Sequence, residues 1–172
     1  QLVDQLNTSH QREQAEAEEK RRAMQLLAAI AKSSSDAIFA KDDQGRYLLV
    51  NNAGFGVAPA GAEESSLQQA QSIFDTNFFG IVRMTRAVVP HMRRQGSGRI
   101  INIGSIIGVV PMPYVALYAA SKHAVEGYSE ALDHELRTRG IRVSVIEPAY
   151  TKTQFEANNV EPDAKLPEYE LI

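Results

Sequence analysis

One group of side chains in this chain has the types and the spacing needed to move a proton: Ser105 and the motif YAASK at residues 118–122. Apolar residues spaced by three and four surround the motif and predict an amphipathic helix that ends near Gly140. Tyr118 and Lys122 are four residues apart, so they share one face of this helix.

The lysine matters because an unperturbed tyrosine is a poor acid at neutral pH. Its pKa is about 10, and half-ionisation near pH 7 requires a shift worth roughly 4 kcal/mol. One ammonium group about 4 Å away supplies an interaction of that size at an effective dielectric of about 20. The spacing therefore predicts that Lys122 lowers the pKa of Tyr118, which becomes a general acid or base for an alcohol or a carbonyl.

Ser105 follows the apolar run RIINIG at residues 99–104, which predicts a buried strand of a parallel sheet. Ser105 then lies at the carboxyl end of that strand. Open α/β sheets bind ligands in the crevice outside these ends. We therefore expect Ser105 to lie beside a ligand-binding crevice.

The other elements alternate between helix and strand. Ser66 begins a predicted helix, with Gln69 placed for a capping box. Gly96 fits its end, and Pro90 is expected to kink or shorten its last turn. The run IRVSVI at residues 141–146 predicts a further strand. This alternation is typical of a doubly wound α/β fold.

Five ordered motifs between about Tyr47 and Thr153 resemble the short-chain dehydrogenase/reductase family. They are NNAG at residues 51–54, Asn77 within DTNFFG, Ser105, YxxxK at residues 118–122, and PAYTKT at residues 148–153. A tyrosine and a lysine four apart occur by chance in many helices, whereas five matches in the right order are specific.

The resemblance implies a partial Rossmann-like parallel sheet and an NAD- or NADP-dependent oxidoreductase that interconverts a carbonyl and an alcohol by hydride transfer. It also implies that the serine holds the substrate oxygen, the tyrosine exchanges its proton, the lysine also grips the nicotinamide ribose, and the asparagine completes a proton relay through water. The implied catalytic residues are Asn77, Ser105, Tyr118 and Lys122. The implied cofactor-binding residues are Asn51, Ala53, Gly54, Tyr118, Lys122, Pro148, Thr151 and Thr153.

Two features depart from the family's pattern. The family usually has a glycine where this chain has Ala149, whose methyl group can obstruct a close approach. No glycine occurs before Gly45, so the glycine-rich turn that holds a dinucleotide pyrophosphate is missing. We therefore expect a sheet that lacks its first strands, an unpaired edge on the strand at residues 47–50, and no activity from this chain by itself.

The amino-terminal part has a different character. Residues 1–32 contain neither glycine nor proline and predict a long helix, with too few large apolar residues to favour a dimerising coil over a solvated helix or frayed linker. Residues 33–52 predict a β-hairpin. Together they resemble a signalling helix followed by the start of a PAS domain. We therefore divide the chain at residue 45, with a PAS-like leader at 1–45 and a truncated dehydrogenase domain at 46–172, as in a chimera or a misassembled reading frame. Gln1 in place of methionine fits a fragment or a trimmed chain.

The composition of the chain narrows the classes of protein to which it can belong. The length of 172 residues suits one domain, the net charge of −3 gives no reason to expect nucleic-acid binding, and the lack of cysteine excludes disulfides and thiolate metal sites. No stretch approaches the roughly 20 apolar residues of a membrane span, and no secretory signal is visible, so we expect a cytoplasmic protein. The expected partner is a small-molecule carbonyl or alcohol. A homo-oligomer stays open, as do two alternative functions: a PAS-type signalling module, and a non-catalytic interaction protein built from a degenerate dehydrogenase half.

Overall fold

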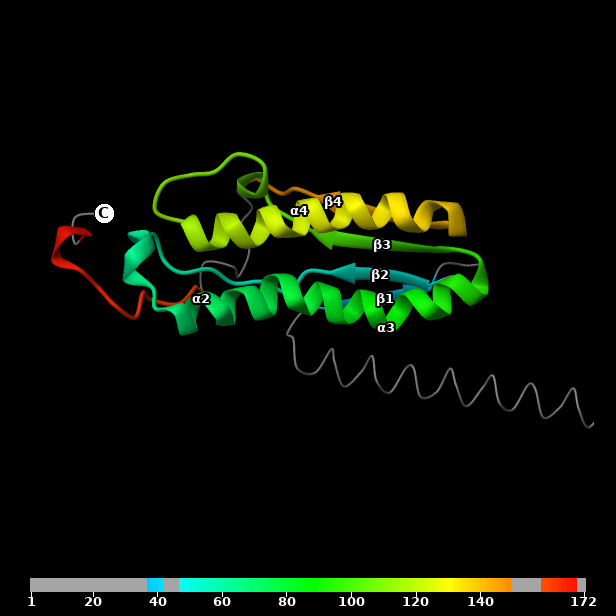
Figure 1. Cartoon of the computed structure of the whole chain (residues 1–172), viewed down its shortest axis with the longest axis horizontal. Helices are drawn as coiled ribbons and strands as arrows, with labels where there is room; N and C mark the ends of the chain where they lie inside the picture. Colours follow the sequence, from blue (N-terminus) through cyan, green and yellow to red (C-terminus); the bar gives the residue numbers. More distant parts are fainter. Residues whose placement is uncertain (1–36, 42–46, 150–158, 170–172) are drawn as a thin grey trace, which may run out of the picture. The chain divides into compact units, whose positions relative to one another are not determined.

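The computed structural model describes residues 37–41, 47–149 and 159–169. The chain divides into two compact units, residues 1–33 and 34–172, and every described residue belongs to the second. The predicted leader helix therefore lies outside the described residues. A four-stranded sheet forms the centre of this unit, in the order β1-β2-β3-β4 (Figure 1). The strands are β1 (Ala37–Lys41), β2 (Tyr47–Asn51), β3 (Gly98–Ile103) and β4 (Ile141–Ile146).

β1 and β2 form an antiparallel hairpin in which Ala37 pairs with Asn51 and Lys41 pairs with Tyr47. The predicted hairpin at residues 33–52 is confirmed for these two strands. The prediction of an unpaired edge on the strand at residues 47–50 is wrong, because β1 pairs with one side of β2 and β3 pairs with the other. The backbone donors and acceptors of β2 are thus used within the sheet.

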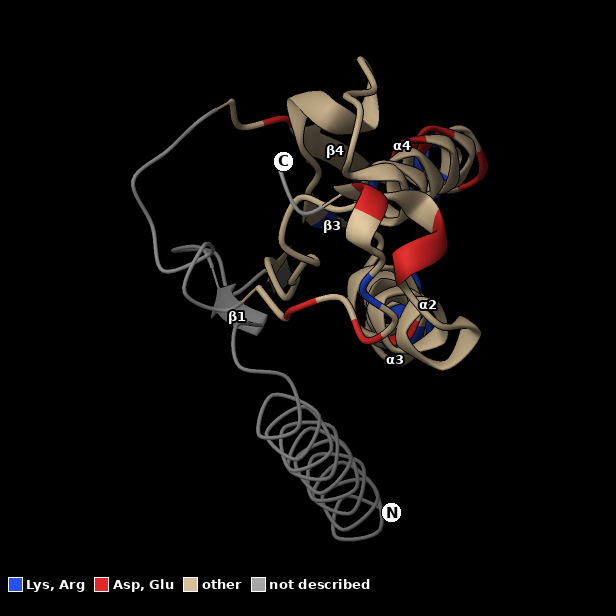
Figure 2. Ribbon diagram, turned by 90° about the vertical axis from the view of Figure 1, so that its left-hand side faces the viewer, with Lys and Arg blue, Asp and Glu red and all other residues tan. Residues whose placement is uncertain are grey.

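β2, β3 and β4 run parallel, which confirms the predicted α/β fold and the strands predicted from the runs at residues 99–104 and 141–146. Within the described part of the chain, the long helices cover one face of this sheet (Figure 2). Side chains alternate between the faces of a strand, so Leu49, Ile100 and Ile141 are buried in the core while Ile101 is only half-buried.

All but the last of the helical elements lie in the connections between β2, β3 and β4, and the last follows β4. The helical elements are η1 (Ala62–Glu64), α2 (Leu67–Phe74), the π-helix η2 (Asp75–Phe79), α3 (Gly80–Gln95), η3 (Ile106–Gly108), α4 (Ala116–Leu136), η4 (Arg137–Arg139) and η6 (Pro167–Tyr169). α2, η2 and α3 follow one another directly. They end at Gly96, whose φ of 72° is left-handed, as expected for a glycine that terminates a helix.

Two details of this helical stretch differ from the sequence-based predictions. The hydroxyl of Ser66 accepts the N–H of Gln69 at 3.1 Å, but the Gln69 side chain donates to the carbonyl of Glu161 at 2.8 Å. Only half of the capping box forms, because that amide bridges to another segment. Pro90 lies inside α3, which continues to Gln95, so the proline does not shorten the helix. Pro90 has no N–H to donate to the backbone carbonyl four residues before it. Because Pro90 is exposed, water can reach that carbonyl.

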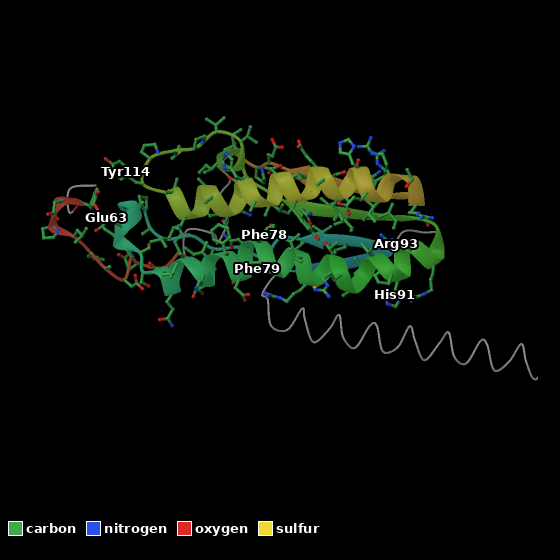
Figure 3. The ribbon with its side chains drawn as sticks, in the orientation of Figure 1. Glu63, Phe78, Phe79, His91, Arg93 and Tyr114 are labelled. Carbon is green, nitrogen blue, oxygen red and sulfur yellow. The ribbon has the colours of Figure 1, made fainter. Side chains whose placement is uncertain are left out.

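The π-helix packs directly on α4. The ring of Phe78 meets Tyr128 of α4 edge-on, with centroids 5.7 Å apart and planes at 87°. Figure 3 shows Phe78 between α3 and α4. At the far end of α4, Gly140 has a left-handed φ of 73° and lies against the carbonyl of Gly96. This contact brings the ends of both helical stretches together before β3 and β4 begin.

Residues 159–169 attach to the segment that follows β2. The carboxylate of buried Glu64 accepts the N–H of Gly61 at 2.7 Å and that of Leu166 at 2.8 Å. Asp163 accepts the backbone N–H and the hydroxyl of Ser66 at 2.7 and 2.5 Å. These bonds fix the carboxyl-terminal segment beside the amino end of α2. The described helices include none that is long and apolar enough to cross a membrane.

Candidate active site

Ser105 is the residue that follows β3, at the edge formed by the carboxyl ends of the parallel strands. The residue is 8% exposed, and its hydroxyl accepts the N–H of Ile107 at 3.3 Å. It also forms a side-chain hydrogen bond with Tyr118 of α4. Ser105 and Tyr118 therefore meet at the sheet edge.

The start of α4 is fixed by the loop that leads into it. Tyr114 has a left-handed φ of 65°, a conformation that is uncommon for a residue with a side chain. Its carbonyl accepts the N–H of Ala60 at 2.9 Å, and its ring lies 6.5 Å from the ring of Tyr169. Figure 3 shows Tyr114 on this loop. The anchoring fixes the first turn of α4, which carries Tyr118.

Lys122 lies one turn further along α4 and is 4% exposed. Its ammonium donates to the carbonyl of Ile103 at 2.9 Å, and Nζ lies 5.7 Å from the centre of the Tyr118 ring. Burial lowers the pKa of Lys122 to about 8, and the negative charge of Glu126 opposes this effect. Tyr118 and Lys122 share one face, as the spacing predicts.

The pKa of Tyr118 moves in the opposite direction to the one predicted. Burial of the phenol raises its pKa above 10.0, and the hydrogen bond from Ser105 only partly offsets this. Two features of the structure explain the error: the phenol is half-buried, and the ammonium of Lys122 is directed to the Ile103 carbonyl rather than to the phenolic oxygen. The protein's own groups therefore hold Tyr118 as a neutral proton donor.

Asn77 lies in the π-helix and is fully buried, at 0% exposed. Its Oδ1 accepts the N–H of Phe55 at 3.0 Å, and its Nδ2 donates to the carbonyl of Phe55 at 2.9 Å and to Ser121 Oγ at 3.0 Å. Ser121 Oγ in turn donates to the carbonyl of Tyr118 at 2.8 Å. Asn77 therefore links the segment after β2 to α4. Its implied role in a proton relay stays a prediction.

The π-helix gives a local reason for this position of Asn77. A π-helical turn contains an additional residue, which turns a side chain that would otherwise face elsewhere, and such turns are frequent at functional sites. The sequence alone indicates neither the π-helix nor the part taken by Ser121. Ser121 stands inside the YAASK motif, and its hydrogen bonds depend on the packing of α4 against η2.

Three of the residues implied in cofactor binding lie at the carboxyl end of β2. Asn51 is 3% exposed, and its Nδ2 has no hydrogen-bond partner among the described residues. Ala53 is buried. A Cβ atom at Gly54 would lie 3.4 Å from Asn77 Oδ1 and 3.5 Å from Lys122 Nζ, so Gly54 lies beside the site. The sequence predicts this convergence through the NNAG motif.

Pro148 follows the carboxyl end of β4, and its carbonyl accepts the N–H of Ile106 at 3.1 Å. Thr151 and Thr153 lie outside the described residues. The unpaired amide of Asn51 and the ammonium of Lys122 give this edge donors that fit the hydroxyls of a nicotinamide ribose. The pyrophosphate of the dinucleotide has no such match. It is held by a glycine-rich turn, and Gly45 is the one glycine before Gly54 in the sequence.

Comparison with known proteins agrees with this arrangement. The model of the short chain dehydrogenase family matches residues 7–164. The 3-ketodihydrosphingosine reductase of Bacteroides thetaiotaomicron is 48% identical over 118 residues, which are 67% of this chain and 43% of that protein. This chain therefore spans less than half the length of that relative.

Solved structures show the same similarity. A short-chain dehydrogenase from Streptomyces avermitilis superposes with a TM-score of 0.66 and 30% identity, over 87% of this chain and 52% of the other. The 3-ketoacyl-(acyl-carrier-protein) reductase of Brucella melitensis, in complex with NADH, gives a TM-score of 0.63 and 30% identity, over 67% of this chain and 55% of the other. With a parallel sheet of the same kind and a family match over most of its length, this chain belongs to the short-chain dehydrogenase family.

Proposed function

We propose that this chain is the catalytic part of an NAD- or NADP-dependent oxidoreductase that interconverts a carbonyl and an alcohol by hydride transfer. The observation that carries the proposal is the hydrogen bond between Ser105 and Tyr118 at the carboxyl end of β3, with the buried ammonium of Lys122 5.7 Å from the tyrosine ring. This combination supplies a proton donor, a group that holds the substrate oxygen and a cation in one place.

Each of the three residues has its own role in the proposed reaction. The hydroxyl of Ser105 donates a hydrogen bond to the carbonyl oxygen and orients it toward Tyr118. Tyr118 gives its proton to that oxygen as negative charge develops there, which is general acid catalysis. Lys122 holds the nicotinamide ribose and stabilises the tyrosinate that remains. A reduced nicotinamide, when bound, supplies the hydride.

We propose reduction of a carbonyl as the direction of the reaction. A phenol with a raised pKa is protonated at neutral pH, and reduction needs a proton donor at that position. Two of the similar proteins have names that describe reduction of 3-keto compounds, and one of them is in complex with NADH. We therefore propose a keto compound as the substrate class and NADH or NADPH as the cofactor.

Replacement of Tyr118 by Phe tests the proposal. The assay needs a form of the protein that also carries a dinucleotide-binding half, because this chain spans about half the length of its similar proteins. Y118F removes only the hydroxyl, so turnover should fall by at least about a hundredfold, while cofactor affinity stays nearly unchanged. K122A should reduce both turnover and cofactor affinity.

The matched control is Y128F, which removes a hydroxyl from another tyrosine on α4 whose ring packs against Phe78. Its turnover should stay close to that of the unmodified enzyme. Turnover that survives Y118F would assign the proton transfer to another group and would defeat the proposed mechanism.

A further inference from the structure

Glu126 is a half-buried acid on α4 to which the proposed mechanism gives no part. It stands one turn after Lys122 on the same helix, so the two side chains lie on one face. Its Oε1 atom is enclosed and has no hydrogen-bond partner among the described residues. An unpaired carboxylate oxygen in such a place is costly, which calls for an interaction that compensates.

The carboxylate of Glu126 reaches the strand end that carries the site. A Cβ atom at Gly104 would clash with Glu126 Oε1, so the glycine leaves room for the carboxylate in its present position. The residue before Gly104 is Ile103, whose carbonyl receives the ammonium of Lys122 at 2.9 Å. The anion and the cation therefore approach adjacent residues at the end of β3.

Among the described residues, the polar groups on the other sides of Lys122 are neutral. The side chain of Asn77 and the backbone of Gly54 face it from η2 and from the segment after β2, and the ring of Tyr118 lies beside it on α4. The charged groups near Glu126 are Lys122 and His123 on the favourable side, and Glu130 and Glu147 on the unfavourable side. Of these acids, Glu126 is the one that interacts with Lys122.

We propose that Glu126 is a positioning residue whose carboxylate is the counter-ion that keeps the buried side chain of Lys122 in its ammonium form at the end of β3. Its importance for catalysis rests on the proposed function, which requires a cation at Lys122. The pairing itself is a property of this chain and needs neither cofactor nor substrate.

The pKa values support this assignment. Burial lowers the pKa of Lys122 to about 8, and Glu126 acts against that decrease. The pKa of Glu126 is raised by burial and by the charges of Glu147 and Glu130, while Lys122 and His123 lower it. Each partner therefore favours the charged form of the other, as expected for a pair in a site of low polarity.

The test is a titration of the Lys122 side chain, followed by NMR of the labelled lysine carbon next to Nζ in this chain. In E126Q the negative charge is lost, so the pKa of Lys122 should fall by about one to two units, the size expected for charges roughly 6 Å apart at an effective dielectric of about 20 to 40. E126D keeps the negative charge on a shorter side chain, so the pKa of Lys122 should fall less in E126D than in E126Q. The exposed Lys165 serves as an internal reference that should not move.

E130Q is the matched control, because it makes the same substitution one turn further along α4. It should shift the Lys122 titration by less than about half a unit. Backbone amide spectra of each variant report whether the fold is kept. The proposal is overturned if folded E126Q leaves the Lys122 titration unchanged, if E130Q shifts it equally, or if the Glu126 carboxyl is already protonated at pH 7. Since no turnover is measured, these results stand apart from the test of the proposed function.

Discussion

Replacement of Asp133 by Asn should show how strongly the helix that carries the site is attached to the sheet. Asp133 lies on α4 and is 7% exposed. Its Oδ1 accepts the backbone N–H of Val143 in β4 at 2.8 Å and Nε of Arg142 at 3.0 Å, and its Oδ2 accepts Nη2 of Arg137 at 2.8 Å. One carboxylate thus connects α4, η4 and β4.

The expected loss of folding free energy in D133N follows from the pKa of Asp133. The hydrogen bond from Val143, then that from Arg142 and the charges of Arg142 and Arg137, lower the pKa of Asp133 from 3.8 to about 2. This shift corresponds to roughly 2 kcal/mol of folding free energy at neutral pH. Arg137 and Arg142 have side chains 45% and 59% exposed, so solvent screens part of their contribution. We expect D133N, which keeps the shape and one acceptor, to cost about 1 to 2 kcal/mol at pH 7.

The assay is urea unfolding of both proteins at pH 7 and at pH 3. A lowered carboxyl pKa stabilises the fold above the pKa of the unfolded state and loses that effect as the pH falls through the folded value. The difference between the two proteins should therefore shrink by about half at pH 3. D75N is the control, because Asp75 pairs with Arg83 at 2.8 Å on the surface and should contribute at most about 0.5 kcal/mol. A D133N effect of the same size at both pH values would assign the loss to packing and refute the electrostatic account.

Three further predictions concern two glycines and the cofactor. G104A should lower the free energy of unfolding by about 1 to 3 kcal/mol, because a methyl group would meet Glu126 and lie 2.7 Å from Cγ1 of Val145. G127A, in an open position on α4, should instead raise it by up to about 1 kcal/mol. This chain, which has no glycine-rich turn before Gly54, should bind neither NAD nor NADP with useful affinity. Saturable micromolar binding in calorimetry of monodisperse protein would contradict this last prediction.

The arrangement of the main elements is predictable because it depends on local patterns. Apolar periodicity and glycine endings locate α4 and the long helical stretch before Gly96, and apolar runs locate β3 and β4. The hairpin of β1 and β2 follows from two short apolar runs around a polar turn. The same hairpin supplies the edge partner that the sequence-based account of a missing sheet half leaves out.

Other features of the site depend on tertiary contacts that no local pattern contains. The spacing of Tyr118 and Lys122 fixes their shared face but not the direction of a pKa, which is decided by burial and by the carbonyl of Ile103. The link from Asn77 to Ser121 requires a π-helix packed on α4. The division of the chain at residue 45 and the PAS-like leader stay predictions, since most of that leader lies outside the described residues.

The catalytic face of α4 has a simple geometry with a chemical consequence. Tyr118, Lys122 and Glu126 follow one another at intervals of four, and their contacts fall on three consecutive residues at the end of β3: Ser105, the carbonyl of Ile103, and Gly104. Eight residues of helix rise about 12 Å, whereas three strand residues span only about 7 to 10 Å, so the three side chains converge on a short length of strand. Groups brought together in this way interact, and each proton equilibrium depends on the charge of the others. The pKa values show the coupling between Lys122 and Glu126, whereas the pKa of Tyr118 is set by its own burial and by Ser105. A change at Glu126 should therefore alter the charge of Lys122, and through it the binding of the cofactor, before it alters the proton donor.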